Sequence, residues 1–270
     1  MEITAYLVNE SRARRPELAR DPLAAEWIPE AVREDVRRLW QEYASDVYPY
    51  DDLVVSLRCR CVLDALAGAL AAAPDTVLVV CGAGFTSYPW LLPFPVAVEV
   101  DLPRIIDAKR DRTRELVAAG VVKDRQVAQL AADLADEADR RAVVEQVREL
   151  AAGRPVAYVA EGLIFYLSAG DARAVAGLGT AMSERVLSVV SYWPAAARDN
   201  QVLAAQRAWF RRHQVPEQPT LLTVEELAAA IGSTVDNHSP EDMQRRYLGE
   251  VTVTEPALVP EHVAIAGAVA

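Results

Sequence analysis

The apolar residues of this chain gather into short valine-rich runs that alternate with longer stretches of helical spacing. Short apolar runs are typical of buried strands, and apolar positions three and four apart are typical of helices. The runs lie at residues 76–81, 96–101, 127–132, 155–160 and 186–190, and the main helical stretches between them lie at 102–119, 138–152 and 171–182. This alternation predicts an α/β fold with a doubly wound, mostly parallel sheet and helices on both faces.

The segment before this region is mainly helical. Residues 1–50 hold three helix-like pieces separated by prolines, and helical spacing over 53–73 predicts a long helix. The first segment is too short to bury a core of its own, so we expect it to form a helical cap on the sheet.

The last segment predicts further helices and two late strands. An arginine-rich helical stretch covers 198–213, and Thr223 and Glu226 have the spacing of a capping box at the start of a helix over 223–231. Residues 251–254 and 262–266 are expected to close the sheet edge as strands.

Composition narrows the partners. A chain of 270 residues, 52% hydrophobic, can bury one substantial core, and its net charge of −11 argues against binding nucleic acid or an anionic membrane. No apolar run is long enough to span a membrane, and the first 20 residues lack the apolar core of a signal peptide. The expected partner is therefore a small molecule or a peptide. Three cysteines without a CxxC pair favour a reduced, cytoplasmic protein. The oligomeric state cannot be inferred.

A glycine turn follows the first strand. Gly82-Ala83-Gly84 allows a ligand to approach the backbone closely, although a tight turn without a ligand would look the same. A Rossmann-like dinucleotide fingerprint requires a third glycine where Ser87 stands, so the turn favours a ligand without a pyrophosphate.

Acidic residues end the next strands. Asp101 lies 19 residues beyond Gly82, and Glu99 shares its face of the strand, so both are expected to reach ribose hydroxyls in one crevice. Asp133 and Glu161 end two later strands. Glu161 interrupts an apolar stretch, where a carboxylate needs a cationic or hydrogen-bonding partner. These features predict adenosine binding; surface-exposed strand ends are the alternative.

Three motifs then point to one family. Residues 77–85 (VLVVCGAGF), 98–103 (VEVDLP) with Lys109, and 161–167 (EGLIFYL) resemble, in order and spacing, the leucine carboxyl methyltransferase family. The similarity covers roughly residues 8–193 and includes residues 20–24 and Arg58.

The resemblance implies S-adenosyl-L-methionine as cofactor, S-adenosyl-L-homocysteine as product and no metal. It implies that Arg58 holds the methionine carboxylate, with Arg12 assisting. The glycine turn would contact the methionine moiety, and Glu161 would lie near its amino group or sulfonium. Asp101 would bind the ribose. The adenine would lie near Asp133 and Leu134.

We expect a single methyltransferase domain over 1–270, because a chain of this length commonly forms one α/β domain. Its expected parts are a cap at 1–57, a cofactor-binding core at 58–193, a lid or substrate segment at 194–222 and the end of the sheet at 223–270.

One departure bears on the acceptor. Many bacterial members carry an Asp-Thr-Arg-like stretch after the glycine turn, where this chain has Thr86-Ser87-Tyr88-Pro89-Trp90. The aromatic bulk resembles the tetracenomycin-type polyketide carboxyl methyltransferases, so the expected product is a methyl ester of a small-molecule, polyketide-like or peptide acid.

The expected chemistry needs no general base, because a carboxylic acid is ionised at neutral pH. Arg207 and Arg211, one helical turn apart beside Trp209, are candidates to position the substrate carboxylate, although a solvated arginine face has the same pattern. Further candidates for substrate contact are Tyr88, Trp90, Tyr166, Tyr192 and Trp193.

Two alternatives stay open. Hydroxyl methylation would need a base, for which His213 is the only candidate. A noncatalytic S-adenosylmethionine-binding protein is the other. Cys59 and Cys61 lack histidine partners in a metal-binding pattern.

Overall fold

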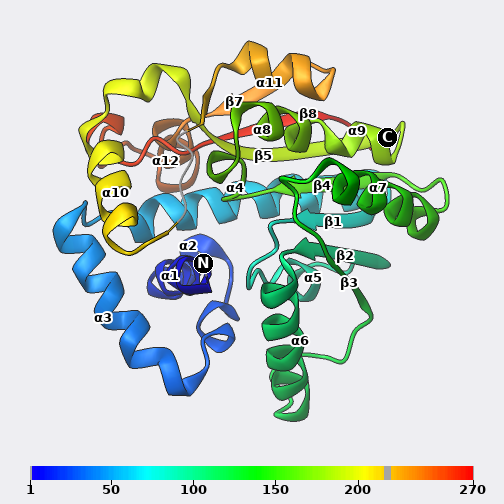
Figure 1. The fold of residues 1–270 in the computed structure, drawn as a ribbon, viewed down its shortest axis with the longest axis horizontal. Coiled ribbons are helices and arrows are strands. Elements are labelled where there is room, and N and C mark those ends of the chain that lie inside the picture. The colour runs from blue at the N-terminus through cyan, green and yellow to red at the C-terminus, as the bar shows by residue number, and fades with distance from the viewer. Residues whose placement is uncertain (1, 216–219, 270) are drawn as a thin grey trace.

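The computed structural model describes residues 2–215 and 220–269, which fold around one mixed sheet (Figure 1). The sheet has the strand order β3-β2-β1-β4-β5-β8-β7, with β6 paired to β5. Strand β8 is antiparallel to β5 and β7, and the other pairs are parallel. The strands are β1 (Val77–Cys81), β2 (Val96–Asp101), β3 (Val127–Ala131), β4 (Val156–Ala160), β5 (Val186–Pro194), β6 (Leu221–Leu222), β7 (Val235–His238) and β8 (His262–Gly267). The predicted fold class is confirmed.

Both faces of the sheet are covered, which explains why the central strands are continuously apolar. Alternate residues of β1 point to opposite faces: Val77 and Val79 pack in one core cluster, and Leu78 and Val80 in another. The first cluster is closed by α7 (Glu137–Ala151), α8 (Ala169–Ala176), α9 (Leu178–Met182) and α11 (Val224–Ile231). The second is closed by α4 (Asp51–Ala72), α5 (Tyr88–Leu91) and α12 (Pro240–Leu248). Helix α6 (Pro103–Ala118) contacts β2 and β3.

The N-terminal helices pack together beside α4. Figure 1 shows α1 (Glu2–Arg14), α2 (Pro16–Ala19) and α3 (Glu30–Asp46) gathered at the N-terminal end of α4. Helix α1 packs against α3, α4 and the short helix η1 (Ala24–Trp27), and α10 (Gln201–Arg212) packs against α3. The shorter 3-10 turns are η2 (Ile164–Tyr166), η3 (Ala195–Asp199) and η4 (Glu255–Ala257). Within the described residues, no helix is long and apolar enough to cross a membrane.

The late strands were predicted half correctly. Residues 262–266 lie in β8, but 251–254 form no strand, because the Gln244 side chain bonds the backbone of that segment. Its Oε1 accepts from Thr252 N at 2.9 Å and Val253 N at 3.0 Å, and its Nε2 donates to Val253 O at 2.7 Å. The sheet edge is instead β7, and its polar sequence gave no strand prediction.

Two helix predictions also change in detail. The stretch 171–182 is two helices separated at Gly177, where an added Cβ would lie 2.2 Å from Ala230 O. Helix α10 begins only at Gln201, because Asn200 caps it by accepting from Leu203 N. The capping box at Thr223 is confirmed.

Candidate functional site

A cavity of about 370 Å³ opens at the carboxyl ends of β1, β2, β3 and β4, where open α/β sheets bind ligands. Its volume is in the range of small-molecule sites, about 300–1,000 Å³. Its wall consists of residues that follow these strands and of side chains from α1 and α4. The expected site residues in it are Arg12, Arg58, Gly82, Ala83, Gly84, Asp101, Asp133, Leu134, Glu161 and Tyr166.

The glycine turn presents backbone to this cavity without offering it an anion cradle. Gly82 has φ +66°, and a Cβ there would lie 3.0 Å from Leu163 Cβ, so close packing as well as backbone conformation requires glycine. The N–H groups of Gly82 and Ala83 both donate to Val100 O, at 2.9 and 3.1 Å. Since Gly84 N donates to Asp101, all three turn donors are used within the protein. This supports the inference that the ligand lacks a pyrophosphate.

Asp101 is held rigidly at the cavity wall. Its Oδ2 accepts from Gly84 N and its Oδ1 from Leu102 N, each at 2.7 Å. Burial raises the pKa of Asp101, against the lowering effect of these two bonds. Each carboxylate oxygen keeps a second acceptor position, so the group remains able to accept from ligand hydroxyls.

Glu99 does not share this role in the structure. Its side chain is fully buried and outside the residues that line the cavity, because Lys109 Nζ binds its Oε1 at 2.5 Å and Gln129 Nε2 binds its Oε2 at 3.2 Å. Lys109 also donates to Thr86 O at 3.0 Å, so the pair ties β2 to α6 and to the segment after the glycine turn. The alternation argument placed Glu99 on the correct face but could not show that a lysine occupies it.

Asp133 and Leu134 stand at the rim. Asp133 is exposed, and its Oδ1 accepts from Ala135 N at 2.9 Å, which fixes the turn after β3. The Leu134 side chain is buried and supplies an apolar surface beside it. A carboxylate next to an apolar wall suits a planar, weakly polar ring.

Glu161 is neutralised by the protein itself. Arg12 Nη2 and Arg58 Nε both donate to its Oε1 at 2.7 Å, and the Tyr88 hydroxyl donates to its Oε2. Burial alone raises the pKa of Glu161, but the two guanidinium groups outweigh it and lower the pKa to about 2. The carboxylate that the sequence left without a partner therefore has three, and its Oε2 keeps one acceptor position.

Arg58 is shared between two carboxylates. Besides Glu161, its Nη1 binds Glu261 Oε2 at 2.5 Å, and Glu261 also accepts from Ser191 Oγ at 3.2 Å. Within residues 2–215 and 220–269, Arg58 Nη2 donates no hydrogen bond although Arg58 lines the cavity.

Sequence reasoning missed Glu261 because it considered only residues after parallel strands. Strand β8 is antiparallel to β5, so the residue before β8 reaches the same sheet edge. An acidic residue directly before a predicted edge strand was the available signal.

A comparison with known families shows which family the chain belongs to. A family model described as leucine carboxyl methyltransferase matches residues 2–177. The chain belongs to the leucine carboxyl methyltransferase family. Its activity is therefore S-adenosylmethionine-dependent methyl transfer, as the motifs predicted.

Solved structures agree on the fold. A candidate methyltransferase from Thermobifida fusca YX has a TM-score of 0.62 at 17% identity, covering 88% of this chain and 89% of that chain. A DUF574 family protein from Streptomyces avermitilis MA-4680 has a TM-score of 0.63 at 14% identity, covering 86% and 90%. No curated protein sequence matches this family member significantly.

The aromatic residues expected around the substrate lie mostly in packed clusters of the methyltransferase. Tyr88 is buried against Glu161, and Tyr192 donates to Asn237 Oδ1 at 2.8 Å. Trp90 packs on Trp27 with ring centroids 5.0 Å apart. Trp193 stacks on Phe165, and Trp209 packs edge-on against Tyr43. Of the aromatic candidates, only Tyr166 lines the cavity at the strand ends.

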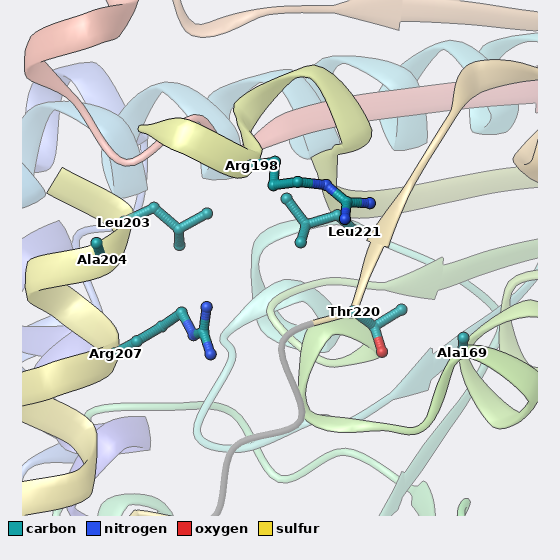
Figure 2. A pocket seen from close by; sticks show the side chains of 7 residues that line it. All are labelled: Ala169, Arg198, Leu203, Ala204, Arg207, Thr220 and Leu221. Atoms are coloured by element: carbon teal, nitrogen blue, oxygen red, sulfur yellow. The ribbon is translucent and has the colours of Figure 1, made fainter. Parts of the chain in front are cut away.

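The two arginine candidates for substrate positioning differ in their surroundings. Arg207 lines a second cavity of about 340 Å³, shown in Figure 2, whereas Arg211 lies outside both cavities. The two residues are four apart on α10, yet only one of them faces the hollow. His213 stacks on Trp209 and contacts Glu42 Oε1 at 2.8 Å, also outside both cavities.

Proposed function

We propose that this methyltransferase forms a methyl ester on the carboxylate of a small-molecule acid, polyketide-like in kind, or of a peptide. The cofactor part of the proposal rests on the convergence of Gly82, Asp101, Asp133, Arg58 and Glu161 on one cavity at the strand ends, and the carboxylate acceptor rests on the absence of a histidine among its described lining residues. These residues are far apart along the chain, and the fold brings them together.

The residues present fit S-adenosylmethionine. Arg58 Nη2 has no acceptor within the described residues, which suits the methionine carboxylate, and Glu161 Oε2 keeps an acceptor position for the amino group. Asp101 would accept from the ribose hydroxyls. The adenine would lie by Asp133 and Leu134, and Arg12 acts through Glu161, whose position it fixes.

The cofactor, when bound, supplies an electrophilic methyl group: the acceptor oxygen bonds to its carbon while the sulfur–carbon electron pair returns to sulfur, which leaves a neutral ester and S-adenosylhomocysteine. The residues of the chain bind the cofactor and the acceptor, orient them toward each other and exclude water. Among the described residues that line the cavity there is no histidine, and burial raises the pKa of Tyr166, which keeps its hydroxyl protonated at neutral pH. An acceptor that is already an anion fits this site better than a phenol that must lose a proton.

The surroundings support further parts of the proposal. Tyr166 faces the cofactor side and stacks on Phe210 of α10, so we propose that α10 borders the acceptor. The three cysteines are buried free thiols, which supports a reducing, cytoplasmic compartment.

The test uses the whole protein, S-adenosylmethionine labelled in its methyl group, and a panel of aromatic and polyketide-like acids. Mild alkali on the labelled product should release volatile labelled methanol, as an ester does. Label that stays in the product would mean an ether or amine and would refute ester formation. Cofactor binding without label transfer to any acceptor would favour a noncatalytic binding protein.

A further inference from the structure

The second cavity differs from the first in that no acidic residue stands among the described residues that line it. It lies among η3, α10 and β6, and it is lined by Ala169, Arg198, Leu203, Ala204, Arg207, Thr220 and Leu221. In Figure 2 the side chains of Arg198 and Arg207 extend into the hollow from different elements. A guanidinium group carries several N–H donors and binds carboxylates well, so a cavity lined by two arginines suits an anionic ligand.

Arg198 has no interaction partner among the described residues. It makes no hydrogen bond or ion pair with any residue in the described ranges, although the chain carries a net charge of −11. Arg207 brings a second guanidinium to the same hollow from one turn before Phe210. The Thr220 hydroxyl is already committed, since it donates to Leu167 O at 2.6 Å. Among the described lining residues, recognition of a ligand's polar group therefore depends first on Arg198, with Arg207 beside it.

The rest of the lining is apolar. Leu203 is 3% exposed and Leu221 is half-buried, with two alanines beside them. A small inorganic anion would leave these surfaces wet, whereas an organic acid with an apolar body would cover them. The lining thus favours a carboxylate carried on an aromatic or aliphatic group.

Both cavities flank one short segment of chain. Tyr166 and Leu167 line the cofactor-side cavity, and Ala169 lines the second one. Helix α10 joins them as well, with Arg207 facing one cavity and Phe210 stacked on Tyr166 of the other.

We propose that the second cavity is a subsite for the carboxylate of an organic acid with an apolar body. The acid is either a second, non-reacting acidic group of the methyl acceptor, which rests on the proposed function, or a separate ligand.

The direct test is calorimetric titration with benzoate, in the presence of saturating S-adenosylhomocysteine to fill the first cavity. Benzoate should bind measurably, while benzamide, which lacks the charge, and acetate, which lacks the apolar body, should each bind at least tenfold more weakly. Arg198→Gln should weaken benzoate at least tenfold. Arg141→Gln, which removes an exposed arginine on α7, should leave it unchanged.

Benzoate binding that is equal in wild type and Arg198→Gln, or benzamide binding as tightly as benzoate, would overturn the subsite. Absence of S-adenosylhomocysteine binding would instead overturn the proposed function, and the comparison of wild type with Arg198→Gln would still report on the second cavity.

Kinetics with an acceptor found by methyl labelling then identify the source of the acid. If the acceptor carries it, Arg198→Gln should raise KM for that acceptor at least tenfold and leave kcat within twofold. If the ligand is separate, KM should stay unchanged while benzoate binding is lost. Both results place an organic acid in the cavity.

Discussion

The ion pair between Glu99 and Lys109 offers a demanding test of the structure, because both side chains are fully buried. The Nζ–Oε1 distance is 2.5 Å, and both groups have further partners in Gln129 and Thr86. Burial raises the pKa of Glu99 and lowers that of Lys109, while each charge opposes the shift of the other. Loss of one partner leaves the other as an uncompensated charge in the core.

The expected magnitude follows from the size of the chain. Breaking a buried pair from one side costs about 3–5 kcal/mol. With roughly 2.1 cal/mol/K of unfolding entropy per residue, a chain of 270 residues has about 0.57 kcal/mol/K, so Lys109→Met should lower Tm by roughly 5–9 °C. Its remaining carboxylate can avoid the charge by taking a proton, so the loss should be smaller at pH 5 than at pH 8.

Thermal melts followed by circular dichroism would compare Lys109→Met, Glu99→Gln and the double variant. The double variant should be more stable than Lys109→Met alone, because no isolated charge remains. Additive losses would refute the reasoning about the pair. S-adenosylhomocysteine affinity of the double variant should stay within threefold of wild type; a tenfold loss would return Glu99 to the cofactor site.

Three further outcomes follow from single residues. Gly82→Ala should lower the urea midpoint more than Gly120→Ala, since both have positive φ but only the Cβ at residue 82 meets Leu163, with a total cost of about 1–3 kcal/mol. The pKa of Glu161 is lowered to about 2, so its ionised form contributes about 3 kcal/mol of folding stability that is present above pH 4.5 and lost as pH falls toward 2. The Tm of Glu161→Gln should therefore depend less on pH over that range than the Tm of wild type. Burial raises the pKa of Asp51 to about 6, which has the opposite sign: its ionisation disfavours folding as pH rises through 6, so Asp51→Asn should gain Tm relative to wild type between pH 4 and pH 8.

Much of the sheet could be predicted from the sequence because its central strands are buried on both faces. Val77–Cys81 and Val156–Ala160 are apolar throughout, and a glycine or an acidic residue follows each run directly. Strand β7 gave no such signal, because an edge strand faces water and can be polar. Residues 251–254 gave a false signal, since β-branched residues also occur where a side chain such as Gln244 satisfies the backbone.

The site was predictable where backbone position decides function, and less so where side chains compete for partners. Gly82 and Asp101 lie in one cavity because the ends of β1 and β2 meet at one edge of the sheet, and α4 brings Arg58 to the same cavity. The sequence could not show that Lys109 would claim Glu99 or that Glu261 would reach Arg58 from an antiparallel strand. Both depend on contacts between distant segments, which no local pattern specifies.

The central claim is that the cavity at the strand ends holds S-adenosylmethionine with Asp101 on its ribose. Calorimetric titration with S-adenosylhomocysteine tests it most directly, in wild type, Asp101→Ala and the control Asp107→Ala, which removes an exposed carboxylate on α6, the helix that follows β2. Wild type and the control should bind alike, and Asp101→Ala should bind at least tenfold more weakly, about 1.4 kcal/mol. No binding by wild type, or unchanged affinity in Asp101→Ala, would contradict the account.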